Sequence, residues 1–252
     1  MRYLLANWKM YPTVEESVAL LGAIQGGLRR RQQSSSDLPL VIVCAPFVSL
    51  APLRAEVDGQ LVRLGAQTCH WEPEGPHTGE ISPRMLQGLV DYVMVGHSER
   101  RAAGETDDQV ADKVAAVAGA GLVPILFVGE DERGDDALPQ TERRLRHGLR
   151  GVDLTRQHVL VVYEPTWAIG AEQPADADYV GGMVEHLKVQ LRSLGSSRPE
   201  VLYGGTVADE NVDQFCRLQV LDGVGATRGS LDADAFLAML HRITDPAPSR
   251  PR

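Results

Sequence analysis

The sequence predicts an α/β protein built as a single (β/α)8 barrel, in which eight parallel strands alternate with helices. Two observations carry this prediction: short apolar runs recur along the chain, and amphipathic helical patterns lie between many of them. The runs are continuous rather than alternating, as expected for strands of a parallel sheet that is buried on both faces. Eight such units fit within the chain of 252 residues, which is the usual size of one such barrel.

Eight runs rich in leucine and β-branched residues are the expected strands. They occupy residues 3–6, 40–45, 61–66, 91–96, 122–129, 158–164, 200–205 and 221–226. Amphipathic patterns predict helices between several of them, and Thr13 is placed to cap the first. These patterns cover residues 13–30, 107–121, 175–195 and 230–243. The connections after the second, third and seventh strands are shorter and carry weaker helix signals.

A doubly wound parallel sheet is the alternative architecture. That fold usually carries a glycine-rich phosphate-binding turn after its first strand, whereas this chain has NWKM at residues 7–10. We therefore expect one barrel domain over residues 1–244. Residues 245–252 form a proline-rich tail that we expect to fray.

Composition and charge exclude several classes of function. The formal net charge of −9 disfavours a nucleic-acid partner, because phosphate backbones select a basic protein face. No apolar run reaches the roughly 18 residues of a membrane helix, and residues 1–10 hold too short an apolar run for a signal peptide. Three widely spaced cysteines predict neither a disulfide framework nor a zinc site. We expect a cytoplasmic protein with no membrane or nucleic-acid partner.

Lys9 is notable because lysine is rare in this chain. Three of the 25 basic residues are lysine, and the remaining 22 are arginine. A lysine carries a compact ammonium with rotatable donors, whereas an arginine carries a wide planar fork. Position 9 is therefore a candidate site for a point charge, although a lysine after a strand is more often simply solvated.

In a barrel of this kind, the reacting groups lie at the carboxyl ends of the strands. The candidates at those positions are Asn7, Lys9, His97, Glu99 and Glu164. An ammonium, an imidazole and a carboxylate that converge are suited to acid–base chemistry on a small substrate. Glu164 is the most informative of them, because a carboxylate at the end of an apolar strand is costly to bury.

Two glycine-rich stretches precede helices after the seventh and eighth strands. The first, YGGT, contains Gly204, Gly205 and Thr206, and the second, GATRGS, contains Thr227 and Arg228. Backbone amides at a helix start bind phosphate when no side chain covers them. The same glycines would also serve as ordinary tight turns. The phosphate site is therefore predicted from the joint pattern and not from either stretch alone.

His70 and His77 are a weak metal candidate in the stretch CHWEPEGPHTGE at residues 69–80. Acidic or thiolate ligands at a usable spacing are missing from this stretch. We therefore expect no metal at this place in the chain.

Together these motifs resemble the triosephosphate isomerase family along nearly the whole chain. The matching stretches are ANWKM, CAPF, GAQ, GPHTGEIS, VGHSERR, VGE, YEPTWAIG, LYGGTV and SLDADAF. The resemblance implies a TIM barrel that interconverts glyceraldehyde 3-phosphate and dihydroxyacetone phosphate in glycolysis and gluconeogenesis, through an enediol and without a metal or organic cofactor. GPHTGE at residues 75–80 resembles the loop that enters the neighbouring subunit, which implies a homodimer.

The resemblance also implies a role for each candidate. Glu164 is similar to the base that moves a proton between neighbouring carbons, and His97 to the neutral electrophile that polarises the carbonyl. Lys9 is similar to the cation that faces the developing enediolate. Asn7 adds a donor beside it, and Glu99 is similar to a carboxylate near the lysine.

The stretch PTWAIGAEQPA (165–175) resembles the mobile lid of the family. Trp167 belongs to its rigid apolar middle, and Gly170 is placed to offer an amide to the phosphate. Glu130 and Tyr203 correspond to residues that latch the lid. Closure implies protection of the enediol phosphate, which would otherwise lose its phosphate in water.

Two segments that face the substrate depart from the family pattern. The last phosphate loop usually reads V-G-G-A-S-L, whereas this chain has Thr227 and Arg228 in place of two glycines. Arg228 either turns outward or binds the phosphate by charge-assisted hydrogen bonds. The second hinge of the lid usually reads T-G-K-T-A, whereas residues 171–175 read AEQPA. The proline there predicts a change in hinge stiffness.

These departures leave an alternative substrate open. The variant hinge and the arginine resemble a branch of the family that interconverts four-carbon ketose phosphates, L-erythrulose 1-phosphate and D-erythrulose 4-phosphate. The three-carbon substrate is preferred, because its motifs cover more of the chain. A barrel that binds a sugar phosphate without catalysis is a remote alternative, which the intact Lys9, His97 and Glu164 disfavour.

Overall fold

The computed structural model describes residues 1–33, 38–171, 173–226 and 228–245, and these residues form a closed barrel of eight parallel strands. Each strand pairs with the next one in the chain, and the last pairs with the first. The strands are β1 (Tyr3–Asn7), β2 (Leu40–Ala45), β3 (Val62–Ala66), β4 (Tyr92–Val95), β5 (Val123–Val128), β6 (Leu160–Tyr163), β7 (Val201–Tyr203) and β8 (Gly223–Ala226). The predicted single (β/α)8 barrel is confirmed, and each predicted apolar run overlaps one strand.

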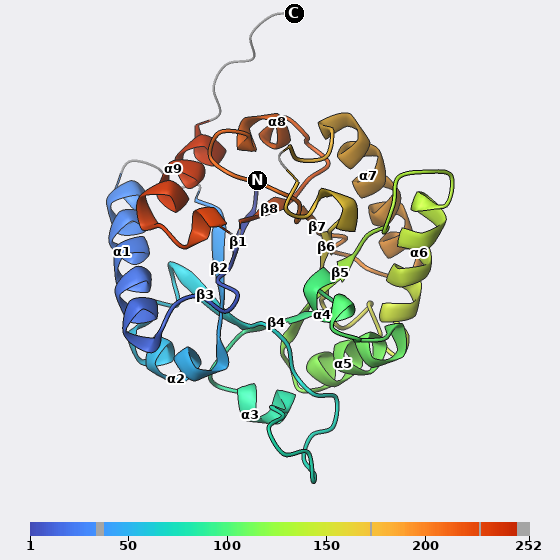
Figure 1. Ribbon diagram of the computed structural model, residues 1–252, viewed down its shortest axis with the longest axis horizontal. Helices are drawn as coiled ribbons and strands as arrows, with labels where there is room; N and C mark the ends of the chain where they lie inside the picture. The colour runs from blue at the N-terminus through green and yellow to red at the C-terminus, as the bar shows by residue number, and fades with distance from the viewer. Residues whose placement is uncertain (34–37, 172, 227, 246–252) are drawn as a thin grey trace, which may run out of the picture.

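A ring of helices covers the outer face of the strands (Figure 1). The α-helices are α1 (Val14–Gln32), α2 (Phe47–Glu56), α3 (Pro83–Leu86), α4 (Ser98–Ala102), α5 (Asp107–Gly119), α6 (Ala137–Gly148), α7 (Ala177–Ser193), α8 (Val212–Cys216) and α9 (Ala233–Thr244). Two 3-10 helices, η1 (Thr166–Ala168) and η2 (Arg228–Ser230), follow β6 and β8. Within the described ranges, each helix is too short or too polar to span a bilayer.

The first helix begins where the sequence predicted its cap. The Thr13 hydroxyl accepts a hydrogen bond from the Glu16 amide at 3.3 Å, and the Glu16 carboxylate accepts one from the Thr13 amide at 2.8 Å. This reciprocal pair satisfies two of the amides that a helix start leaves without helical partners. Thr106 and Gln109 repeat the arrangement at the start of α5.

The strands bury side chains on both of their faces. On β1, Leu4 and Ala6 belong to the large cluster between strands and helices, whereas Tyr3 and Leu5 belong to the cluster inside the barrel. Side chains on a strand alternate between the two faces, so both must be apolar here. This double burial is the physical reason why the strands read as continuous apolar runs.

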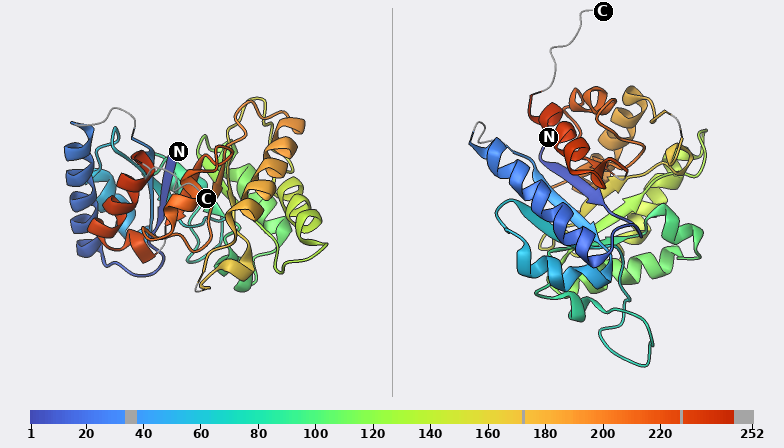
Figure 2. Two further views of the ribbon diagram at one scale, coloured as in Figure 1. Left: turned by 90° about the horizontal axis from the view of Figure 1, so that it is seen from above. Right: turned by 60° about the vertical axis from the view of Figure 1, so that its left-hand side comes forward.

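The parallel arrangement brings the carboxyl ends of the strands to one face of the barrel. The segments that follow β1, β4, β6, β7 and β8 therefore meet there, although they are far apart in the chain. The connection between β3 and α3 instead projects beyond the ring of helices (Figure 1 and Figure 2). The segments after five strands thus meet at one face of the barrel, and the connection between β3 and α3 protrudes from it.

Candidate active site

A cavity of about 420 Å³ lies where these segments meet. The predicted site residues that line it are Lys9, His97, Glu99, Glu164, Gly170, Gly204, Gly205, Thr206 and Arg228. Further lining comes from Tyr11, Ile169, Ala171, Val207, Ala208 and Gly229. Thr227, which was also predicted, lies outside the described residues. The fold thus brings five separate segments around one enclosed space.

Lys9 is held in an unusual backbone conformation at the edge of this cavity. Its φ is 48°, and among the described residues no other side-chain-bearing residue has a positive φ. Such a conformation costs roughly 1–3 kcal/mol and persists only where neighbours enforce it. Here the Lys9 amide donates to Asn7 Oδ1 at 3.0 Å, and Gln67 Nε2 donates to the Lys9 carbonyl at 2.9 Å. The Nζ atom donates to Glu99 Oε1 at 2.6 Å, which fixes the ammonium as well.

His97 caps the start of α4 with its own imidazole. Its Nδ1 accepts a hydrogen bond from the Glu99 amide at 3.2 Å, so the proton of the neutral ring sits on Nε2. Nε2 lies 3.1 Å from Glu164 Oε1 and 3.4 Å from Asn7 Nδ2. Burial lowers the pKa of His97 to about 4; the Glu99 carboxylate opposes this shift, and the Lys9 ammonium adds to it. The imidazole is therefore neutral at physiological pH and points its N–H toward the cavity.

Glu164 follows directly after β6 and is buried. Its Oε2 accepts a hydrogen bond from the Ser98 amide at 2.8 Å, while Oε1 faces His97. Burial raises the pKa of Glu164 to about 8, although the Ser98 hydrogen bond opposes the shift. A carboxylate with a raised pKa binds a proton more tightly than an ordinary one, and its ionised form, which acts as the base, becomes populated as the pH approaches 8.

Gly129 determines how closely the ends of β5 and β6 approach. A Cβ atom at this position would lie 2.1 Å from the Glu164 carbonyl oxygen and 2.5 Å from its carbonyl carbon. Both atoms are backbone and cannot turn aside. Gly129 was not among the predicted site residues, because only the folded arrangement reveals this contact.

The segment after Glu164 is tied down at both of its ends. At the first end, Trp167 Nε1 donates to Glu130 Oε1 at 2.8 Å. At the second end, the Ala175 amide donates to the Tyr203 hydroxyl at 3.0 Å. The structure thus brings Glu130 and Tyr203 to the two ends of the predicted lid, behind the cavity and not in its lining.

The glycine-rich turn after β7 has a packing requirement of its own. A Cβ atom on Gly205 would lie 2.0 Å from the Tyr203 hydroxyl oxygen, in the middle of a buried ring contact. Thr206 points its hydroxyl at the Ala168 carbonyl, 2.9 Å away, and so connects this turn to η1. Gly205 is therefore required by close packing, and its bare amide is available to the cavity as a consequence.

Sequence reasoning missed several residues that support the site. The Glu130 carboxylate also accepts hydrogen bonds from the hydroxyls of Tyr163, Tyr179 and Thr141, at 2.9 to 3.1 Å. Tyr163 begins the YEPTWAIG stretch, whereas Thr141 and Tyr179 lie outside every quoted motif, so only the folded arrangement shows that the three converge on Glu130. Tyr11, in contrast, follows Lys9 by two positions and could have been found as a neighbour of the motif.

The metal candidate behaves differently from the acid–base residues. The rings of His70 and His77 stack with centroids 4.3 Å apart, in the projecting loop and away from the cavity. Across the described ranges, no group of three or more His, Cys, Asp and Glu side chains is arranged to hold a metal ion. The chemistry that the cavity itself offers is that of a base, two N–H donors and a cation.

Such a set of groups can move a proton on carbon. A base with a raised proton affinity removes a proton beside a carbonyl, and N–H donors with an ammonium stabilise the oxyanion that forms. His97 Nε2 and Asn7 Nδ2 lie side by side, so both can point at one oxygen. The geometry is that of an enolisation site.

Comparison with known proteins agrees with this chemistry. A family model described as triosephosphate isomerase matches residues 2–243. A triosephosphate isomerase of Dehalococcoides mccartyi is 35% identical over 247 residues, which cover 95% of this chain and 96% of the relative. One of a Synechococcus species is 37% identical over 240 residues, covering 93% and 94%. The crystal structure of triosephosphate isomerase from Bartonella henselae superposes with a TM-score of 0.83 at 29% identity, covering 96% of this chain and 100% of that one.

These relatives support the three-carbon reading of the sequence and do not favour the four-carbon alternative. The match spans the barrel from β1 to α9 and includes every strand end that lines the cavity. The chain belongs to the triosephosphate isomerase family, which consists of aldose–ketose isomerases.

Proposed function

We propose that this protein interconverts D-glyceraldehyde 3-phosphate and dihydroxyacetone phosphate through an enediol intermediate. The observation that carries the proposal is the contact of 3.1 Å between His97 Nε2 and Glu164 Oε1, inside a cavity that Lys9 also lines. A neutral N–H donor and a buried carboxylate stand next to each other there. Both are needed, at the same time, to remove a proton beside a carbonyl.

The reaction begins with an exchange of hydrogen-bond partners. The substrate carbonyl oxygen accepts a hydrogen bond from the Nε2–H of His97. This N–H then no longer contacts Oε1 of Glu164, which becomes free to act as the base. Glu164 then removes a proton from the neighbouring carbon, and the C–H electron pair forms the carbon–carbon double bond of the enediolate. The negative charge on oxygen faces the Lys9 ammonium and the Asn7 amide, and preorganised donors of this kind contribute strongly to catalysis. One proton must then pass between the two oxygens: His97 gives its Nε2 proton to the enediolate oxygen and takes the proton of the neighbouring hydroxyl. Glu164 returns its proton to the other carbon as that hydroxyl oxygen becomes the new carbonyl, which completes the isomerisation.

The phosphate group is assigned to the side of the cavity formed by the glycine-rich turns. Gly170, Gly205 and Gly229 line the cavity, and unobstructed amides near helix starts favour anions. Arg228 lines the same side with an exposed guanidinium. We assign it a charge-assisted contact with the phosphate, which replaces amide contacts that the family usually makes there.

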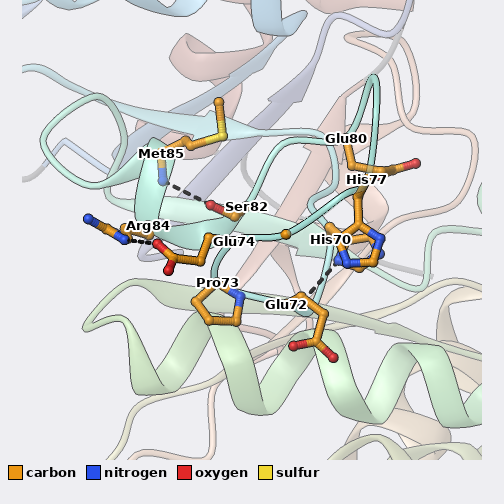
Figure 3. A pocket seen from close by; sticks show the side chains of 10 residues that line it. His70, Glu72, Pro73, Glu74, His77, Glu80, Ser82, Arg84 and Met85 are labelled. Atoms are coloured by element: carbon orange, nitrogen blue, oxygen red, sulfur yellow. Dashed lines mark hydrogen bonds and ion pairs between the residues drawn. The ribbon is translucent and has the colours of Figure 1, made fainter.

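We further infer a homodimer formed through the projecting loop. The loop and the start of α3 surround a hollow of about 470 Å³ lined by His70, His77 and three glutamates, as Figure 3 shows. Met85, which lines this hollow, is 58% exposed, and Met10 and Val48 are exposed apolar side chains elsewhere on the chain, at 95% and 72%. Exposed apolar groups of this size support a protein interface. Sedimentation or light scattering of the purified protein tests the dimer, and a monomeric mass would contradict it.

We also infer a cytoplasmic location. Cys44, Cys69 and Cys216 are free thiols, and Cys44 and Cys69 are buried. Proteins of oxidising compartments more often link their cysteines, so the thiols support a reducing compartment. Fractionation of the source cells tests this, and recovery outside the cytoplasm would contradict it.

The function is tested by comparing kcat/KM for D-glyceraldehyde 3-phosphate with that for L-erythrulose 1-phosphate. We expect the triose to be preferred by about 10²-fold, the range that one extra carbon group allows in a fitted pocket. Glu164→Asp retracts the base and should lower kcat by about 10²-fold. Faster turnover of the tetrulose, or unchanged turnover in Glu164→Asp, would overturn the proposal.

A further inference from the structure

A cluster of aromatic and charged side chains lies behind the lid, around Glu130. Glu130 is fully buried, and its Oε1 accepts hydrogen bonds from Trp167 Nε1 at 2.8 Å and from the Tyr179 hydroxyl at 2.9 Å. A buried carboxylate is stable only when strong donors surround it. Glu130 therefore anchors the polar end of each of these two aromatic side chains at one point.

Arg133 contacts the faces of the same two rings. Its Cζ lies 4.9 Å from the Trp167 ring centroid and 4.6 Å from the Tyr179 ring centroid. The rings meet edge to face, with centroids 5.9 Å apart. Both distances from Arg133 are within the roughly 6 Å range of a cation–π interaction. Its neighbour Asp131 is already engaged by Arg144, at 2.9 Å, and so does not compete for Arg133.

The three side chains come from the two ends of the lid and from a neighbouring connection. Trp167 belongs to η1 at the start of the lid, and Tyr179 belongs to the first turn of α7 just beyond its end. Arg133 belongs to the connection between β5 and α6, and α6 lies beside α7 in the ring of helices (Figure 1). Arg133 thus connects the beginning of the lid to the helix that follows it.

We propose that Arg133 is a positioning residue for the isomerisation: it holds Trp167 against Tyr179, so that the lid closes from a defined starting point. The inference rests on the proposed function for its effect on catalysis. Arg133 itself is exposed, so the removal of its charge leaves the core intact. The arginine fork is planar and stacks on aromatic rings better than an ammonium does.

The test replaces Arg133 by Met, which keeps an unbranched apolar stem but removes the guanidinium and its charge. A cation–π contact at an exposed site corresponds to a change of about 2- to 5-fold in an equilibrium. We expect kcat/KM for the triose phosphate to fall by this factor. Inorganic phosphate released per isomerisation should rise, because an uncovered enediolate breaks its C–O bond to phosphate as its electron pair forms a new double bond.

Arg133→Lys should lie between the wild type and Arg133→Met, since it keeps the charge but not the planar stack. Arg192→Met is the matched control, because Arg192 is an exposed arginine at the other end of α7. Its kcat/KM and its phosphate release should equal those of the wild type. A purely structural effect of losing an arginine would not separate the two variants.

Amide hydrogen exchange gives a readout that does not need activity. The Thr166 amide donates to the Glu130 carbonyl at 2.9 Å, and the Ile169 amide donates to the Thr166 carbonyl at 3.1 Å. Both should exchange about 2- to 5-fold faster in Arg133→Met than in Arg192→Met. Equal exchange in the two variants would overturn the role of Arg133. Failure of the wild type to isomerise the triose would overturn only the proposed function, because the exchange comparison would still decide the role of Arg133.

Discussion

The Nζ atom of Lys9 lies 2.6 Å from Oε1 of Glu99, and the other two lysines of the chain make contacts of the same kind. Lys113 and Lys188 each contact one buried or half-buried carboxylate, at 2.5 and 2.7 Å. An arginine-rich protein has thus kept lysine where a single carboxylate must be met by a compact ammonium. At position 9 the same ammonium also faces the cavity. One lysine side chain thus both contacts Glu99 and presents a positive charge to the substrate site.

Lys9→Arg should leave the protein folded and lower its activity strongly. The guanidinium is too wide to keep both the Glu99 contact and the position that faces the developing oxyanion. Loss of one preorganised donor of this kind typically lowers kcat by about 10²- to 10³-fold. Steady-state kinetics measure the loss, and circular dichroism checks the fold. Lys188→Arg, which makes the same change away from the cavity, is the control and should keep its kcat.

His97 should remain neutral throughout the physiological range. Its pKa is lowered to about 4 by burial, so the ring gains a proton only well below pH 5. Nitrogen-15 NMR of labelled imidazole should show one protonated and one bare nitrogen from pH 8 down to pH 5. His97→Asn identifies the signal by removing it. A ring that titrates near 6.5 would contradict the proposed role as a neutral donor.

Glu164→Gln should make the protein more resistant to unfolding in mild alkali. Folding raises the pKa of Glu164 from 4.5 to about 8, so the native state favours the protonated form. The stability contributed by this group is complete below pH 4.5 and is lost as the pH rises through about 8. Gln stays neutral and avoids the loss, which is on the order of a few kcal/mol. Urea unfolding at pH 4.5 should therefore give similar stabilities for the wild type and Glu164→Gln. By pH 8 the variant should be the more stable of the two. A stability difference that does not change with pH would contradict this.

Gly129→Ala should impair catalysis by displacing the base. The new methyl group would lie 2.1 Å from the Glu164 carbonyl oxygen, and the backbone of Glu164 must move to relieve the overlap. A displacement of about 1 Å costs on the order of 10²-fold in rate. Gly119→Ala is the control, because a Cβ there meets nothing within 4 Å and the helix should gain stability. Equal kcat for the two variants would contradict the steric argument.

Arg228→Met should weaken substrate binding without changing the chemical step. An exposed ion pair contributes modestly, so KM should rise about 2- to 5-fold at low ionic strength while kcat stays constant. The difference should shrink as salt screens the charge. Arg217→Met removes an exposed arginine near α8 and should have no effect on KM. A KM that is equal in the two variants would show that Arg228 points away from the phosphate.

Much of the fold could be predicted because burial leaves a direct trace in the sequence. The runs at 40–45 and 122–129 are apolar on both faces because barrel strands are covered on both sides. Thr13 was recognisable as a cap because capping acts within four residues. The short helices α3 and α8 gave little signal, because four or five residues are too few to show an amphipathic period.

The acid–base residues of the candidate site were predictable because each lies within two positions of a strand end, whereas the phosphate contacts of Gly170 and Arg228 were expected only from the family resemblance. Lys9, His97 and Glu164 lie at strand ends, so the topology alone brings them together. The left-handed backbone of Lys9 and the close approach at Gly129 depend on atoms far away in the chain. The contact of Arg133 with two rings likewise joins side chains 34 and 46 positions away, a separation over which no local pattern acts.

The scarcity of lysine has a practical consequence for chemical labelling. The side chains of Lys113 and Lys188 are only 6% and 12% exposed, whereas that of Lys9 is 22% exposed and opens onto the cavity. An amine-selective reagent therefore meets one accessible lysine side chain. A reporter group attached at Lys9 would sit in the cavity itself, and a bound phosphorylated sugar would protect that amine from the reagent.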